Sequence, residues 1–257
     1  MKVSLFIPCL VDRFFPQIGL DTARLLELAG HEVYYDPRQT CCGQPAFNSG
    51  DLKDALCLAR RFLKVFGEAE AVVAPSGSCV SMVANHFEDL PLSPSEMALW
   101  EQLRHRVFEL AQFLDATDSL RHLKVKNPRR VALHHSCHFL RELHGADTSL
   151  ARLLARVEGL EVVPATPEQC CGFGGTFSFK FQEVSLNMAE DKVRAFQATG
   201  ADTLILADAG CLMNIQGVIE AQGLADQLKV QHYSALFFPD TGHPLPGGRG
   251  SDGGGEP

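Results

Sequence analysis

Eight of the nine cysteines occur as two sets in the same order. In each set a single cysteine precedes an adjacent pair followed by glycine, and a second single cysteine comes later. Thiolates are soft ligands that select iron–sulfur clusters, zinc or copper(I). The repeated order therefore predicts two metal or redox sites, built by two copies of one supersecondary unit. The first set is Cys9, Cys41, Cys42 and Cys79, and the second is Cys137, Cys170, Cys171 and Cys211.

The adjacent pairs favour an iron–sulfur cluster over zinc. Structural zinc sites usually take cysteines that are separated by roughly two to four residues. Two adjacent thiols reach one centre only where the backbone turns, and Gly43 and Gly172 give the chain that freedom. A multi-iron cluster is larger than one ion and accepts two adjacent thiolates on different irons. We therefore rank an iron–sulfur cluster first and zinc second.

Other residues near the pattern have plainer interpretations. Cys57 lies within a run of helical spacing, where a free cysteine commonly packs as a small hydrophobe. Three histidines crowd around Cys137. Metal ligation, hydrogen bonding to cluster sulfur and simple packing all stay open for them, although no matching histidine flanks Cys9. Asp208 is expected to cap the helix that follows it. The three histidines are His134, His135 and His138.

Strands alternate with helices in both halves of the chain. Strands are predicted at Val3–Ile7, Glu32–Tyr35, Ala71–Ala74, Val131–Leu133, Glu161–Val163 and Thr203–Ala207, with helices at Ile18–Ala29, Leu52–Phe66, 149–157 and 182–198. This alternation implies parallel strands. The cysteines follow the strands, so they meet at the carboxyl edge of a sheet. The predicted fold is α/β, with two pseudo-repeated lobes, each a short parallel sheet carrying a cysteine cluster at that edge.

Four segments follow from this pattern. Residues 1–90 form the first cysteine-rich repeat, and residues 128–240 form the second. Between them, residues 91–127 are predicted to be a helical linker, in which a capping box at Ser93–Glu96 starts one long helix that runs through Leu114. Residues 241–257 are rich in glycine, proline and polar residues, which predicts a disordered tail.

Composition excludes several classes of function. A net charge of −8 argues against a nucleic-acid surface. The chain shows neither a signal peptide nor an apolar run long enough to span a membrane. Nine cysteines without an export signal indicate a reducing cytoplasm, where they serve as metal or redox ligands.

The motifs resemble a known family. The sequence is similar to the CCG cysteine-rich domain, which occurs in heterodisulfide reductase and in the iron–sulfur subunits of glycolate and glycerol-3-phosphate oxidising complexes. Two copies in a stand-alone chain resemble the lactate-utilisation protein A family. The resemblance implies a cytoplasmic iron–sulfur protein in L-lactate oxidation to pyruvate, working with two partners, a ferredoxin-like iron–sulfur protein and a third subunit. It is carried by residues 6–9, 39–45, 75–79, 135–138 and 170–177.

One departure affects the cluster that the resemblance implies. Repeats of the heterodisulfide reductase type close with Cys-x-x-Cys, whereas Met82 and Asn214 stand at the matching places here. Each set thus has four cysteines, which argues against a five-thiolate non-cubane cluster and suits two ordinary four-iron clusters. Zinc in one repeat, a zinc-stabilised scaffold and thiol–disulfide catalysis stay open. No sequence fingerprint of a flavin or nicotinamide site is evident. We therefore expect the hydride transfer to take place on another protein and do not expect this chain to be active alone.

Overall fold

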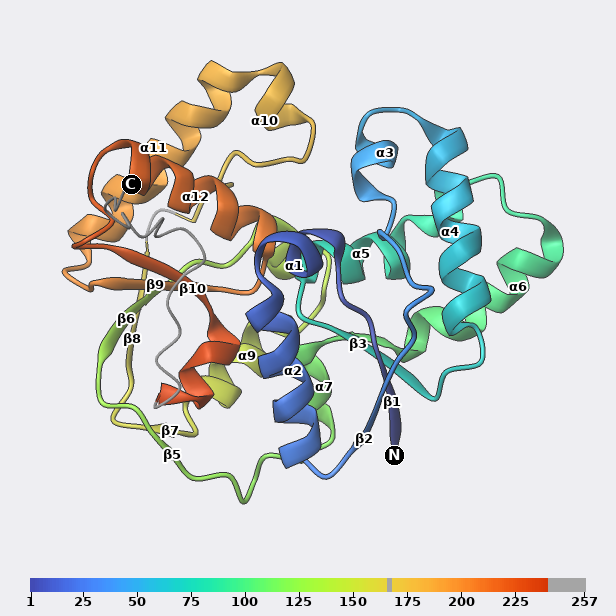
Figure 1. Ribbon diagram of the computed structural model, residues 1–257, viewed down its shortest axis with the longest axis horizontal. Helices are drawn as coiled ribbons and strands as arrows, with labels where there is room; N and C mark the ends of the chain where they lie inside the picture. The colour runs from blue at the N-terminus through green and yellow to red at the C-terminus, as the bar shows by residue number, and fades with distance from the viewer. Residues whose placement is uncertain (166–167, 240–257) are drawn as a thin grey trace, which may run out of the picture.

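Two four-stranded parallel sheets with helices around them make up the molecule (Figure 1). The computed structural model describes residues 1–165 and 168–239. The strand order is the same in both sheets. The first runs β2 (Glu32–Tyr35), β1 (Lys2–Leu5), β3 (Ala71–Ala74) and β4 (Val107–Glu109). The second runs β8 (Glu161–Pro164), β6 (Arg130–Leu133), β9 (Thr203–Leu206) and β10 (Lys229–His232).

Strand register repeats as well. Val3 of β1 lies opposite Ala71 of β3, and Val131 of β6 lies opposite Thr203 of β9. Every residue of β3 and β9 is buried, as expected for strands covered on both faces. The prediction of two α/β repeats with short parallel sheets is confirmed. A further parallel pair, β5 (Val125–Lys126) with β7 (Val157–Glu158), lies outside these sheets.

The helices follow the strands in each repeat. In α4 the apolar residues recur at helical spacing, so Ala55, Ala59 and Phe62 share one buried face. Asp51 caps this helix by accepting a hydrogen bond from the backbone N–H of Asp54 at 3.1 Å. The α-helices of the first part are α1 (Cys9–Phe14), α2 (Pro16–Leu28), α3 (Gln44–Asn48), α4 (Leu52–Phe66), α5 (Gly77–Asn85), α6 (Pro94–Leu103) and α7 (Leu110–Ala116). Those of the second part are α8 (Cys137–Arg141), α9 (Ala146–Leu154), α10 (Phe177–Lys180), α11 (Gln182–Ala198) and α12 (Ala209–Ala221).

The segment between the repeats differs from the prediction. The capping box is present, because Ser93 accepts from the N–H of Glu96 and the Glu96 carboxylate accepts from the N–H of Ser93. However, α6 ends at Leu103, and a 3-10 turn (η2, Arg104–Arg106) leads into strand β4. The prediction of one long helix is therefore wrong. The segment completes the first sheet, and the α7 helix follows β4 directly.

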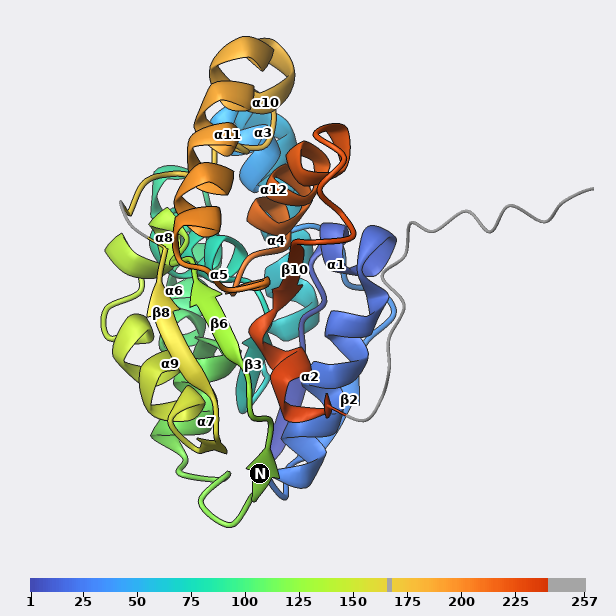
Figure 2. The ribbon, with the colours of Figure 1, turned by 90° about the vertical axis from the view of Figure 1, so that its left-hand side faces the viewer.

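One helix from each repeat packs against the other repeat. The α2 helix of the first repeat packs against the 3-10 turn η3 (Tyr233–Phe237) that follows β10, and the α9 helix of the second packs against α7, which follows β4 (Figures 1 and 2). Val11 and Ile18, from α1 and α2, accordingly belong to the core around the second sheet. Leu150 of α9 belongs to the core around the first. The repeats are therefore joined by reciprocal packing.

Two further predictions concern the C-terminal tail and membrane-spanning helices. The tail predicted at residues 241–257 lies outside the described residues. Among the helices of residues 1–165 and 168–239, none combines the length and the apolar character needed to cross a bilayer.

Candidate metal centre

Strand ends place the cysteines at equivalent positions of the two repeats. Cys9 and Cys137 are the first residues of α1 and α8, which follow β1 and β6. Cys79 and Cys211 each lie in the first turn of the helix that follows β3 or β9. A helix N-terminus favours negative charge and so favours the thiolate that binds a metal. Each adjacent cysteine pair follows the edge strand β2 or β8.

The thiols of each set converge as predicted. In the first set the sulfur atoms of Cys9 and Cys41 lie 3.5 Å apart, and those of Cys42 and Cys79 lie 3.3 Å apart. In the second set the sulfur atoms of Cys171 and Cys211 lie 3.0 Å apart. All nine cysteines of the chain are free thiols. Residues that are far apart in sequence thus form two compact sulfur clusters.

A glycine after each pair makes the required turn. Gly43 has a φ of 93° and Gly172 a φ of 85°, a region that side chains disfavour. This turn directs the N–H of Gly43 to the sulfur of Cys41 at 3.5 Å, and the N–H of Gly172 to the sulfur of Cys170 at 3.4 Å. A Cβ atom on Gly172 would lie 2.6 Å from the carbonyl oxygen of Ser185. Glycine is therefore needed where the chain folds around the sulfur atoms.

Hydrogen bonds lower the pKa of one thiol in each set. The pKa of Cys41 is lowered because Cys42 and Cys9 donate hydrogen bonds to its sulfur, helped by the Gly43 amide. The pKa of Cys170 is lowered in the same way by Cys137 and Cys171. The donor thiols have raised pKa values because these bonds and burial favour their protonated form. A bound cation would favour the deprotonated form of the whole set.

All eight cysteines line one cavity of about 280 Å³ between the two repeats. Four of the thiols are buried and four are half-buried, so each set has sulfur atoms facing the cavity. A tetrahedral zinc ion with sulfur ligands at about 2.3 Å would hold them about 3.8 Å apart, close to the spacing here. A four-iron cluster is wider than a single ion, so the thiols would have to move apart to hold one. The donor sets therefore fit a metal ion or an iron–sulfur cluster.

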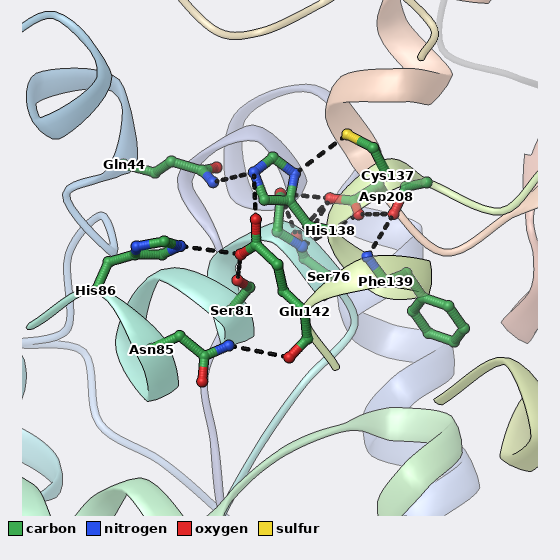
Figure 3. Close-up of polar contacts among 12 residues, drawn as sticks. Gln44, Ser76, Ser81, Asn85, His86, Cys137, His138, Phe139, Glu142 and Asp208 are labelled. Carbon is green, nitrogen blue, oxygen red and sulfur yellow. Dashed lines mark hydrogen bonds and ion pairs between the residues drawn. The ribbon is translucent and has the colours of Figure 1, made fainter. Parts of the chain in front are cut away.

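A buried carboxylate lies between the two cysteine sets. Asp208 is the residue before α12, as predicted for a cap, yet its side chain forms no cap bond with that helix. It accepts hydrogen bonds from Ser76 Oγ at 3.0 Å, Ser78 Oγ at 2.5 Å and Ser136 Oγ at 2.6 Å, and from the N–H of Ser78 at 3.1 Å (Figure 3). It thus joins α5 of the first repeat to α8 of the second.

Histidine 138 connects a thiol of the second set to the first repeat. Its Nδ1 lies 3.5 Å from the sulfur of Cys137, and its Nε2 lies 3.2 Å from Gln44 Nε2 and 4.0 Å from Glu142 Oε1 (Figure 3). Glu142 also pairs with His86 Nε2 at 2.9 Å and accepts from Ser81. His138 therefore lies where it could form a hydrogen bond with the thiol of Cys137.

The other two histidines near Cys137 have different surroundings. His135 pairs with Glu168 at 2.9 Å. His134 is buried, and a nitrogen of its ring lies within 4.8 Å of the sulfur atoms of Cys171 and Cys211. Its burial and the nearby Lys192 lower its pKa to about 3, which leaves the ring neutral. Within residues 1–165 and 168–239, a nitrogen donor of this kind lies beside the second set and not beside the first.

The structure corrects one prediction and adds one residue to the surroundings of the second cysteine set. Cys57 is exposed on α4, so the prediction that it packs in the core is wrong. Lys192, in α11, is fully buried beside the second cysteine set, and sequence analysis did not single it out. The available signal was its place on the apolar face of a helix, one turn from Met188 and one turn from Phe196.

Comparison with known proteins agrees with this architecture. A family model described as a cysteine-rich domain, CCG, matches residues 3–84 and 131–216, and each match contains one complete cysteine set. The Lactate utilization protein A of Halalkalibacterium halodurans is 44% identical over 238 residues, which is 92% of this chain and 96% of the relative. The chain belongs to the lactate utilization protein A family. The family member of Shouchella clausii is 43% identical over 230 residues, 89% of this chain and 96% of the relative.

A solved structure shares the fold with this member of the family. A hypothetical protein from Helicobacter pylori superposes with a TM-score of 0.61 at 13% identity, covering 95% of this chain and 49% of that one. The chain thus spans about half the length of that protein. The likeness extends over both repeats and concerns the fold alone.

Proposed function

We propose that this chain is the iron–sulfur electron-transfer protein of a cytoplasmic system that oxidises L-lactate to pyruvate. Membership of a family whose relatives are named for lactate utilization supports the process. The single structural observation behind the electron-transfer role is the cavity that all eight thiols line. Redox centres held by the two sets would face the same cavity, an arrangement that supports transfer of an electron between them.

Each set of four thiols holds one centre in this proposal. Four thiolates suffice for a four-iron cluster, which would accept and release one electron at a time. Cys9, Cys41, Cys42 and Cys79 would hold the first, and Cys137, Cys170, Cys171 and Cys211 the second. The chain contributes helix N-termini, the amides of Gly43 and Gly172, and a shared cavity that Asp208 and His138 also line.

The proposal assigns the removal of hydride from lactate to another protein. Oxidation of a 2-hydroxy acid transfers a hydride, or its equivalent, to a flavin or nicotinamide. This sequence carries no such fingerprint between a strand and a helix, so the chain would act as a relay. Its partners would be a ferredoxin-like iron–sulfur protein and a third subunit of the same system.

The deciding experiment measures iron, acid-labile sulfide and zinc in protein purified without oxygen. Iron and sulfide in both repeats, with an absorption band that bleaches on reduction, would support the proposal. The short sulfur separations favour one alternative, a zinc-stabilised scaffold, which would show zinc and no sulfide. Protein that carries no metal but reduces disulfides would instead support thiol–disulfide catalysis. Either of these results would refute the proposal.

A second experiment tests the relay. Lactate-dependent reduction of an artificial acceptor is measured with the iron-loaded chain alone and after its genomic neighbours are added. We expect turnover only in the complete mixture. Robust turnover by this chain alone would refute the relay and would direct attention to a substrate site beside the cysteine sets.

A further inference from the structure

The residues behind the two cysteine sets occupy equivalent places but differ in chemistry. Phe6 and His134 each directly follow a central strand, β1 or β6. The N–H of Phe6 donates to the carbonyl of Val73 at 2.9 Å, and the N–H of His134 donates to the carbonyl of Ile205 at 3.0 Å. Val73 and Ile205 lie on the corresponding strands β3 and β9. His134 thus stands where the first repeat has phenylalanine.

A second pair of equivalent residues lies on α4 and α11. A Cβ on Gly43 would approach the Cβ of Leu58, and one on Gly172 would approach the Cβ of Met188, so these two residues correspond. One helical turn further along stand Phe62 and Lys192. Phe62 is 3% exposed and Lys192 is 0% exposed. The second repeat thus buries a lysine where the first buries another phenylalanine.

These differences between the repeats give the two cysteine sets different environments. In the first repeat the rings of Phe6 and Phe62 pack edge to face, with centroids 5.0 Å apart, in the same apolar core as Cys42 and Cys79. In the second repeat the side chain of Lys192 lies within electrostatic range of Cys171, Glu168, Cys211 and Cys170. Its Nζ donates to the carbonyl of Ala165 at 3.4 Å. The first set therefore has an apolar wall and the second a cationic one.

A buried positive charge acts on the reduction of a nearby metal centre. Reduction adds one negative charge to a centre that already carries four thiolates. Coulomb attraction to an ammonium group is strong where little water screens it. The potentials of iron–sulfur centres depend on net charge, hydrogen bonds to sulfur and exposure to solvent. The exposure of the two cysteine sets is alike, position by position. Two acidic groups oppose Lys192. Asp208 lies between the two sets and accepts four hydrogen bonds, and Glu168 is 44% exposed and pairs with His135. The buried Lys192 is therefore the charge that sets the second repeat apart.

We propose that the buried Lys192 makes the metal centre of the second repeat the more readily reduced of the two. The inference rests on the proposed function, in which each set holds a redox centre. One electron passes from the first centre, which is oxidised, to the second, which is reduced. No bond would be made or broken. Electrons supplied by a reduced flavin or an equivalent donor would therefore collect on the second centre.

The test is a redox titration of the full chain, loaded with iron and sulfide, followed by electron paramagnetic resonance. Cys42→Ser leaves the second centre to be measured by itself, and Cys171→Ser leaves the first. We expect the higher potential in Cys42→Ser. Lys192→Met removes the charge at similar length and should lower only the potential of the second centre. Phe62→Met is the matched control in the first repeat, and it should leave the second centre with the higher potential of the two.

Each outcome separates this inference from the proposed function. Iron in both repeats, with the second potential equal to or below the first, would overturn the inference and leave the electron-transfer role standing. An unchanged second potential in iron-loaded Lys192→Met would likewise overturn it. Protein without iron would refute both. The comparison of the two cysteine variants needs no change at Lys192, so it tests the order of potentials even where Lys192→Met fails to fold.

Discussion

Asp208 of the second repeat accepts a hydrogen bond from the hydroxyl group of Ser76 in the first, and these two residues occupy the same position in their repeats. Each is the last residue before the helix that carries the final cysteine, α5 or α12. Both are buried. One repeat thus supplies the acceptor and the other the donor, so an asymmetric pair holds the two halves together beside the cysteine sets.

Replacement of Asp208 should destabilise the whole protein. Asp208→Ala leaves three serine hydroxyl groups and a backbone N–H without their acceptor in a buried place, which should cost about 2–4 kcal/mol of unfolding free energy. Urea denaturation measures the loss. Asp226→Ala, at an exposed position, is the control and should change stability by less than about 0.5 kcal/mol. Equal stability of the two variants would contradict the bridging role.

The two cysteine sets should bind metal independently. Cys171→Ser should remove the iron of the second repeat and largely spare the first, and Cys42→Ser should do the reverse, because no thiol is shared between the sets. Iron per folded chain measures both. Cys57→Ala is the control, since this thiol is exposed and belongs to neither set, and it should retain full iron. Loss of all iron from one folded single variant would refute independent sites.

The turn glycines should differ in their tolerance of a methyl group. Both have positive φ, so alanine strains both backbones by on the order of 1 kcal/mol. At Gly172 the added carbon also meets the carbonyl oxygen of Ser185 at 2.6 Å, whereas at Gly43 the nearest atom is 3.5 Å away. Gly172→Ala should therefore lower the melting temperature more than Gly43→Ala. The reverse order would show that the second turn relaxes easily.

Glu109 should make stability depend on pH. Burial raises the pKa of this carboxyl from its ordinary value of 4.5 to about 8, although hydrogen bonds from Tyr233 and Ala111 oppose the shift. The folded state thus binds a proton that the unfolded state releases, so this contribution is full below pH 4.5 and is lost as pH rises through about 8. Glu109→Gln does not titrate.

Melting temperatures recorded between about pH 6 and about pH 9 test this. The wild-type protein should lose more stability across the range than Glu109→Gln, while both share every other titrating group. Glu158→Gln, whose side chain is largely exposed, should follow the wild type. Parallel curves for wild type and Glu109→Gln would show that the carboxyl group is ionised in the folded protein or costs nothing when it ionises.

Periodicity and spacing were enough to predict the alternating elements and the meeting of the thiols. Strand β3 is a continuous apolar run, and the cysteines follow such strands directly. Strand β4 was missed because its three residues lie within apolar spacing that also suits a helix. The partners of Asp208 were missed because they depend on how two repeats face each other. Lys192 was missed because its alkyl chain fits helical periodicity and only its surroundings make its charge important.

The exchange of helices between the repeats has a consequence for the origin of the chain. A single repeat on its own would leave uncovered the apolar faces that α2 and α9 now bury on the opposite half. An ancestor that carried one repeat would therefore have needed a second identical copy, related by a two-fold axis, to cover the same faces. Fusion of two such copies would release each half from that symmetry. Positions such as those of Asp208 and Lys192 could then diverge from their counterparts without altering the partner site.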